Sequence, residues 1–228
     1  ALVTSCYYAG PCVQGFGPVV TEDRELDEFT AVSNTASFEV RISNSDTFAV
    51  WVEAQENLHQ FIESYVSGST LILKTRNGTW IKPAVPVIVY VQMPLVEEIR
   101  NSGSGRLIAD VADCAEFEMS NSGSGRIQID SVLASTAFVK NSGSGNVYMG
   151  ESWLSGIQVT NTGSGEVQAG IVYGPAEMYV NHTSSGRIMA DLVDGTELEV
   201  RLTGSGRVIL AGDAEKASYS LSSSGRID

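Results

Sequence analysis

The chain has 228 residues, 43% hydrophobic and 18% charged, which is enough apolar material for a core and too little charge for a disordered chain. Lys and Arg number 14 against 27 Asp and Glu, and the net charge of −13 disfavours nucleic acids and anionic lipid surfaces as partners. Two histidines and three cysteines argue against a zinc site of the usual kind, and no apolar run reaches the roughly 18 residues of a membrane-spanning helix.

The chain opens on a segment that reads like the end of a bacterial lipoprotein signal. In residues 2–6 an aliphatic residue and small residues precede a cysteine. We therefore predict that Cys6 is lipidated and that residues 1–14 form the signal end and a tether. A disulfide between Cys6 and Cys12 is the alternative. Either reading exports the protein, and the first places it in the cell envelope, at the outer membrane or cell surface, with the lipid as its only membrane contact.

Residues 15–94 predict irregular, β-rich coils. Apolar and polar residues alternate over 38–42 and 48–52, which is the period of a strand with one buried face. The segments 71–73 and 85–93 read as further strands.

One short helix is predicted within this part, over Glu56–Ser64. Leu58, Phe61 and Ile62 would share its apolar face. A helix here can shield unpaired strand edges at the end of a stack of strands, so we expect it to act as a cap.

From residue 95 to residue 228 a Ser-Gly dipeptide recurs at intervals of 19 to 21 residues. Each of its glycines is followed by one polar residue and then by a branched aliphatic residue, and apolar residues two positions apart flank each copy. Such self-similarity is the signature of a solenoid built from strands. The glycines are Gly105, Gly125, Gly145, Gly165, Gly186, Gly206 and Gly225.

The repeat therefore predicts an all-β fold, a right-handed parallel β-helix with about 20 residues per coil. The right-handed winding is expected because connections between parallel strands are almost always right-handed. Residues 15–228 would form a single domain, with irregular coils over 15–94 and regular coils over 95–228.

The recurring glycines would form one corner of every coil, because glycine permits a positive φ or a close backbone approach. The glycine two residues earlier is less regular, since Ser184 and Ser223 replace it in two copies. We therefore predict that Gly145 tolerates substitution less well than Gly143.

A column of asparagines precedes the corner at intervals of 20 residues. Stacked amides can bond to the coils above and below, so we expect a structural ladder, with a sugar-binding row as the alternative. Near residue 181 the longer coil leaves open whether Asn181 or His182 continues the column. The ladder residues are Asn101, Asn121, Asn141 and Asn161.

Charged and aromatic residues also recur in columns. Arginines follow the corner glycine in five copies, and Asn146 and Glu166 replace them in the middle. Such a column could hold an acidic polysaccharide, but we favour a solvated column neutralised by nearby aspartates. Trp153 and Tyr173 share a coil position and are expected to be neighbours. The arginines are Arg106, Arg126, Arg187, Arg207 and Arg226, and the aspartates are Asp110, Asp130 and Asp191.

Catalysis is not supported by these patterns. Gly150 and Gly170 interrupt the aspartate column, and the chain has no calcium-binding nonapeptide, nucleophile elbow or phosphate-binding loop. Cys114 is expected to be a buried, inert thiol. The sequence thus predicts no enzyme, no catalytic residue, no metal site and no cofactor.

Residues 15–19 (Gly-Phe-Gly-Pro-Val), 24–26 (Arg-Glu-Leu) and 29–32 (Phe-Thr-Ala-Val) precede the ladder of Ser-Gly-Ser-Gly corners. Together they resemble the putative auto-transporter adhesin, head GIN domain family of bacterial surface proteins, common in Bacteroidetes-like organisms. The resemblance covers about residues 15–228 and implies a right-handed β-helix similar to the pectate-lyase architecture.

The function predicted from these features is a non-catalytic β-helical scaffold of the cell envelope that serves adhesion or another surface interaction. Its partner would be a surface protein or a glycan, and self-association into a homo-oligomer is left open. The alternative is a polysaccharide-binding protein or a pectate-lyase-like enzyme. A cleft lined by several acids would favour the enzyme, and a flat aromatic strip would favour binding.

Overall fold

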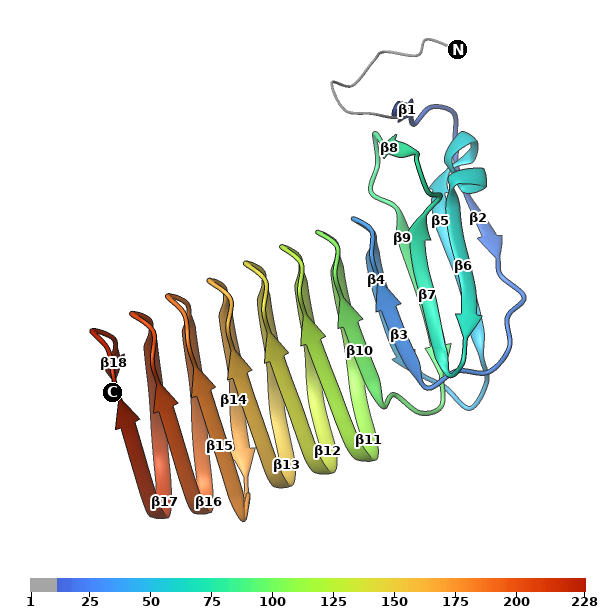
Figure 1. The fold of residues 1–228 in the computed structure, drawn as a ribbon. Coiled ribbons are helices and arrows are strands. Elements are labelled where there is room, and N and C mark those ends of the chain that lie inside the picture. Colours follow the sequence, from blue (N-terminus) through green and yellow to red (C-terminus); the bar gives the residue numbers. More distant parts are fainter. Residues whose placement is uncertain (1–11) are drawn as a thin grey trace.

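The computed structural model describes residues 12–228 and consists almost entirely of β-strands (Figure 1). The predicted lipidation site, Cys6, lies outside the described residues. The strands are β1 (Cys12–Gln14), β2 (Val19–Asp23), β3 (Ala31–Asn34), β4 (Glu39–Asn44), β5 (Ala49–Gln55), β6 (Ile62–Ser67), β7 (Thr70–Thr75), β8 (Trp80–Lys82), β9 (Ile88–Met93), β10 (Glu98–Asn101), β11 (Arg106–Asn121), β12 (Arg126–Asn141), β13 (Asn146–Asn161), β14 (Glu166–Tyr173), β15 (Glu177–His182), β16 (Arg187–Leu202), β17 (Arg207–Leu221) and β18 (Arg226–Ile227).

The regular coils stack in parallel with a step of 20 residues. In β11 and β12, Leu107 pairs with Ile127 and Met119 pairs with Val139, and β12 continues in the same way onto β13. Pairing is interrupted beside Asp110 and Ala115, so each long strand bends twice and forms three straight segments. The predicted β-helix with about 20 residues per coil is confirmed (Figure 1).

The core consists of columns of like side chains, one from each coil. Every second residue of a strand points inward, and equivalent residues lie on neighbouring strands about 4.8 Å apart. Full burial of one aliphatic side chain stabilises the fold by about 1.5–3 kcal/mol. One column with no exposed area is Leu107, Ile127, Val147, Val167, Ile188 and Val208.

The parallel register begins earlier in the chain than the repeated dipeptides suggest. β3 pairs with β10 and β4 pairs with β11, so that Val32 lies beside Ile99 and Val40 beside Leu107. Residues 31–42 thus form a coil of the solenoid, although Ala36 and Phe38 stand where later coils have glycines. The segment between β4 and β10 supplies the strands that close this end.

Antiparallel strands close the N-terminal end of the stack. β7 and β9 continue the parallel ladder from β3 and β4, and β6 and β5 then pair with them antiparallel, with β2 outside β5 (Figure 1). The expected helix is the short 3-10 helix η1 (Glu56–Phe61), and Ile62 already begins β6. Leu58 and Ile62 are buried as expected, whereas Phe61 is only partly buried.

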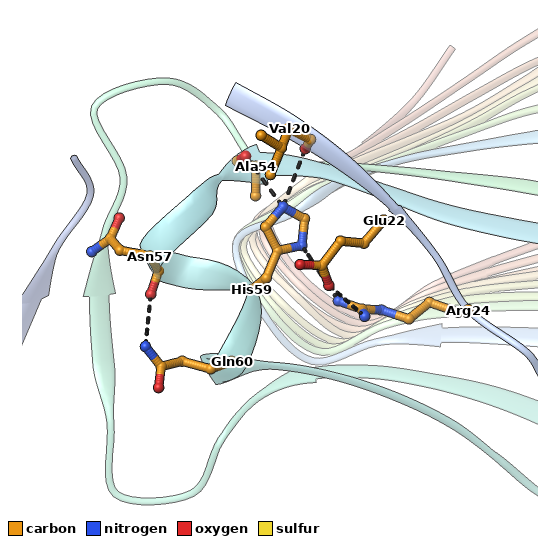
Figure 2. Close-up of polar contacts among 7 residues, drawn as sticks. All are labelled: Val20, Glu22, Arg24, Ala54, Asn57, His59 and Gln60. Atoms are coloured by element: carbon orange, nitrogen blue, oxygen red, sulfur yellow. Dashed lines mark hydrogen bonds and ion pairs between the residues drawn. The ribbon is translucent and has the colours of Figure 1, made fainter. Parts of the chain in front are cut away.

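A buried histidine holds η1 against β2 (Figure 2). His59 Nε2 lies 3.1 Å from the carbonyl oxygen of Val20 and 3.2 Å from that of Ala54. Both partners only accept hydrogen bonds, so Nε2 carries a proton. On the other side of the ring, Nδ1 lies 3.4 Å from Glu22 Oε2, and Arg24 donates to the same carboxylate at 2.9 Å. The cap is therefore fixed by polar contacts as well as by apolar burial.

Candidate functional site

The Ser-Gly corner is tight because successive coils approach closely there. The corner glycines are not among the described residues with positive φ. A Cβ atom at Gly145 would lie 1.9 Å from the carbonyl oxygen of Gly125, and one at Gly143 would lie 2.0 Å from that of Gly123. The two glycines are thus equally constrained, and the predicted ranking of Gly145 above Gly143 is wrong. Serine replaces the earlier glycine only in coils of irregular length, Ser184 in one of 21 residues and Ser223 in one of 19, so these copies do not show tolerance in a regular coil.

Just before the corner glycine, one serine of each coil is exposed to solvent. These serines form a row of hydroxyl groups along the corner, and in five of the seven copies glycine stands on both sides of the serine. The row consists of Ser104, Ser124, Ser144, Ser164, Ser185, Ser205 and Ser224.

The asparagine column lies inside the same corner. Asn101 donates from Nδ2 to Asn121 Oδ1 at 3.0 Å, Asn121 donates likewise to Asn141 at 3.0 Å, and Asn141 to Asn161 at 3.3 Å. Each amide also donates to a carbonyl oxygen of its own turn, such as that of Gly145. The four residues are buried, so their side chains cannot contact a ligand outside the solenoid.

The ladder extends by one member at each end. Asn34 donates to Asn101 Oδ1 at 3.4 Å, a position that sequence reasoning missed because no glycine follows it. At the other end His182, not Asn181, occupies the column, and its two ring nitrogens lie 2.9 Å from the carbonyl oxygens of Asn161 and Gly186. Leu202 follows His182 in the next coil, so the polar ladder ends there.

The first straight segment of each coil carries the arginine column on its outer side. We call this side, formed by 39–42, 106–109, 126–129, 146–149, 166–169, 187–190 and 207–210, the arginine face. Arg187 pairs with Glu166 at 3.2 Å, and Arg207 and Arg226 both pair with Asp228.

The expected neutralisation of the arginines by the aspartate column is wrong. Among the described residues, no ion pair joins Asp110, Asp130 or Asp191 to an arginine. Four residues of extended strand span about 13 Å, which puts an aspartate beyond reach of the arginine that begins its own strand. The acidic partners instead lie two residues away on the same strand, as in the pair of Arg41 with Glu39, or in a neighbouring coil.

Two adjoining hollows lie on the arginine face. The larger, of about 640 Å³, follows the corner over five coils and is lined by the five serines from Ser144 to Ser224 and by the column from Asn146 to Arg226. The smaller, of about 340 Å³, lies where Gly150 and Gly170 interrupt the aspartate column. Tyr148 lines both hollows, and the guanidinium of Arg126 lies 5.1 Å from its ring centroid. These open, polar hollows are the candidate binding site.

The aromatic pair predicted from its spacing lies on the second straight segment. Trp153 and Tyr173 are neighbours, as predicted, with ring centroids 5.1 Å apart and planes inclined by 12°. Leu133 and Val193 continue the exposed column on either side. Because each ring covers a face of the other, this column is not a flat platform on which a sugar could stack.

Cys114 is partly buried rather than fully buried. Burial, together with smaller contributions from the nearby carboxylates of Glu97, Asp113 and Glu116, raises the pKa of its thiol to about 11. The thiol donates to the carbonyl oxygen of Glu116 at 3.3 Å. It is therefore protonated at neutral pH and a poor nucleophile, as expected for a structural cysteine.

Neither a metal site nor a membrane span is found among residues 12–228. No group of three or more His, Cys, Asp or Glu side chains within this range is arranged to hold an ion. None of its helices is long and apolar enough to cross a membrane.

The fold and the outward columns define a β-solenoid that presents polar surface along a rigid frame. The family described as putative auto-transporter adhesin, head GIN domain, matches this chain over residues 28–173 and 159–228. The chain belongs to this family, and the resemblance noted in the sequence is confirmed. No curated protein matches the chain.

Solved structures similar to this one include three from Bacteroidetes. A protein described as a putative adhesin from Bacteroides fragilis has a TM-score of 0.81 at 17% identity, covering 94% of this chain and 98% of its own. A second putative adhesin, from Parabacteroides merdae, has a TM-score of 0.74 at 17% identity, with 95% and 99% covered. A protein described as a putative lipid-binding protein from Parabacteroides distasonis has a TM-score of 0.69 at 20% identity, with 95% and 98% covered. At these identities the likeness shows the shared fold.

Proposed function

We propose that this protein is a non-catalytic adhesion scaffold of the cell envelope that contacts its partner through the arginine face. Family membership and the fold shared with proteins described as adhesins support a role at the surface. The observation that carries the proposal is the polar hollow of about 640 Å³ that follows the corner over five coils. Its length suits an extended partner better than a small molecule.

The frame beneath this hollow is suited to holding side chains in fixed positions. The serine row and the arginine column stand on backbone that the buried asparagine ladder and the glycine contacts lock to the next coil. A rigid array loses little conformational entropy on binding, and the resulting affinity is correspondingly higher.

The enzyme alternative is not favoured. Asp110 and Asp130 lie on adjacent coils, but Gly150 and Gly170 follow them, so no cleft lined by several acids forms there. In addition, Asp130 accepts a hydrogen bond from Gln128 at 3.4 Å, so its carboxylate has a partner within the protein.

The proposal also includes export and a lipid anchor at Cys6. The description of the family as an adhesin supports export. The lipid anchor depends on the sequence of residues 2–6 alone.

Adhesion can be measured with protein-coated beads under flow. The beads would pass over surfaces that carry neutral glycans, acidic glycans or proteins, with albumin-coated beads as the control. We expect retention on at least one class of surface above the control. If no class of surface retains the beads, adhesion by this chain is wrong.

A further inference from the structure

The repeat changes character at one place on the arginine face. In β12, β13 and β14, the second outward column carries an amide, a phenol and an amide, whereas β11, β16 and β17 carry apolar residues there and the first coil carries Arg41. The core column of the same three coils remains aliphatic, so packing does not require the change. The changed residues are Gln128, Tyr148 and Gln168, and the apolar residues of the other coils are Ile108, Met189 and Ile209.

The two columns beside it change in β13 and β14, whereas β12 keeps Arg126 and Asp130. Asn146 and Glu166 replace arginine in the first column, and Gly150 and Gly170 replace aspartate at the bend. All these exceptions surround Tyr148, which lies between the two hollows.

Close packing of the coils accounts for Gly150, since a Cβ there would lie 2.0 Å from the carbonyl oxygen of Asp130. The polar side chains of Gln128, Tyr148 and Gln168 have no such packing reason, and a group of outward side chains that departs from a repeat in one place is expected of a binding site.

Two glutamines flank Tyr148, and one of them, Gln128, donates from Nε2 to Asp130 at 3.4 Å. Strand register places Gln128 and Gln168 on either side of Tyr148, about 4.8 Å away along the solenoid. Gln168 is exposed, and the missing side chains at Gly150 and Gly170 open the hollow of about 340 Å³ beside it.

The amide and phenol groups that line the hollow indicate which class of ligand it can bind. Amides and a phenol both donate and accept hydrogen bonds, as the hydroxyl groups of a sugar do. Arg126 and Asp130, which line the same hollow, balance one another in charge, so the hollow does not favour an ionic ligand. The adjoining row of serine hydroxyls extends the same chemistry along the corner.

We propose that the hollow around Tyr148 binds an extended, neutral glycan chain that continues along the serine row. This inference rests on the proposed adhesive function and names the ligand class of the same face. An acidic glycan would depend chiefly on charge pairing with the arginines from Arg187 to Arg226, whereas a neutral chain would use the same guanidinium groups as hydrogen-bond donors.

Binding can be tested by calorimetry on the full chain with dextran, mannan and galactan as neutral probes and polygalacturonate as the acidic probe. We expect binding to at least one neutral probe, weakened about tenfold by Tyr148→Ala and by Gln168→Ala. Tyr148→Phe, which keeps the ring beneath Arg126 and removes only the hydroxyl, should weaken binding less than Tyr148→Ala does.

Gln158 and Tyr179 provide matched controls. They are the same residue types on adjacent strands, with Arg201 5.6 Å from the Tyr179 ring, but they lie on the third straight segment and line neither hollow. Gln158→Ala and Tyr179→Ala should bind like the unaltered chain. The proposed site would be wrong if the variants at Tyr148 and Gln168 lost no more glycan affinity than those at Tyr179 and Gln158. It would also be wrong if the chain bound only the acidic probe.

Failure of the glycan site can be distinguished from failure of the adhesive function. If beads coated with the chain adhere to protein-coated surfaces while no neutral probe binds, the glycan site is wrong and the adhesive function stands. If neither adhesion nor binding is observed, both are wrong.

Discussion

The Nδ2 atom of Asn121 donates to Oδ1 of Asn141 in the next coil at 3.0 Å, and both side chains are buried. Because Asn121 also accepts from Asn101 and donates to the carbonyl oxygen of Gly123, it connects three consecutive coils. The contact is therefore a structural tie between coils, and the outer surface is left to the serines and arginines.

Replacing Asn121 by alanine should lower the free energy of unfolding by about 3 kcal/mol, because it leaves buried polar groups of Asn101 and Asn141 without their partner. Asn181 is the control: it is partly exposed and lies outside the ladder, so Asn181→Ala should cost less than about 0.5 kcal/mol. Urea unfolding of the two variants measures the difference. Similar losses would show that the ladder does not hold the coils together.

Alanine at Gly143 and alanine at Gly145 should destabilise the chain equally, each by about 3 kcal/mol, since either Cβ would overlap a carbonyl oxygen of the preceding coil. Gly156 provides the contrast. A Cβ there meets nothing closer than 3.8 Å, and Gly156→Ala should be neutral or stabilise by up to about 1 kcal/mol. Thermal unfolding of the three variants tests the close approach, and a large loss at Gly156 would contradict it.

Cys114 gives the fold a dependence on alkaline pH. Its pKa is raised from 9.0 to about 11, so the folded chain holds the proton that the unfolded chain releases. This contribution to stability is complete below pH 9 and is lost as the pH rises through about 11. Cys114→Ala should reduce the loss of stability between these pH values.

The same shift can be followed by alkylation. Peptide mapping after treatment with iodoacetamide should show slow modification of Cys114 at pH 8 in the folded chain and fast modification after unfolding. Rapid modification of the folded chain at pH 8 would mean that the thiol is not held in its neutral form.

The sequence was sufficient to predict the solenoid because its coils repeat the same residues at the same positions. The position of Leu107 and Ile127 two residues after a corner glycine predicts that they pair, and the spacing of the asparagines predicts that they stack. The first coil could not be recognised by its corner, because Ala36 and Phe38 replace the two glycines that mark the corner in later coils. A signal existed, since Val40 follows Asn34 by the same six residues that separate Leu107 from Asn101.

Other features could not be predicted from one-dimensional patterns. Alternation of apolar residues has the same period in parallel and antiparallel strands, so it could not show that β5 and β6 reverse direction to close the end of the stack. The hollow beside Tyr148 depends on side chains that are absent at Gly150 and Gly170. In the sequence these glycines read only as interruptions of an acidic column.

Lipidation of Cys6 predicts that the chain, produced in bacteria with a lipoprotein signal, fractionates with membranes. Cys6→Ser should release it into the soluble fraction, because acyl chains would be its only attachment. Mass spectrometry of the mature N-terminus identifies the acylated residue. A mature chain that keeps residues 1–5 and bonds Cys6 to Cys12 would establish the disulfide instead.

The central claim is that the arginine face is the surface of contact, and paired charge substitutions test it most directly. Arg187→Ser with Arg207→Ser alters the larger hollow, whereas Arg100→Ser with Arg201→Ser removes the same charge from another side of the solenoid. All four arginines are about half exposed and ion-paired, so the two double variants should lose similar amounts of folding stability. Retention of coated beads under flow should fall several-fold for the first variant and stay unchanged for the second. Equal retention of the two variants would contradict the claim.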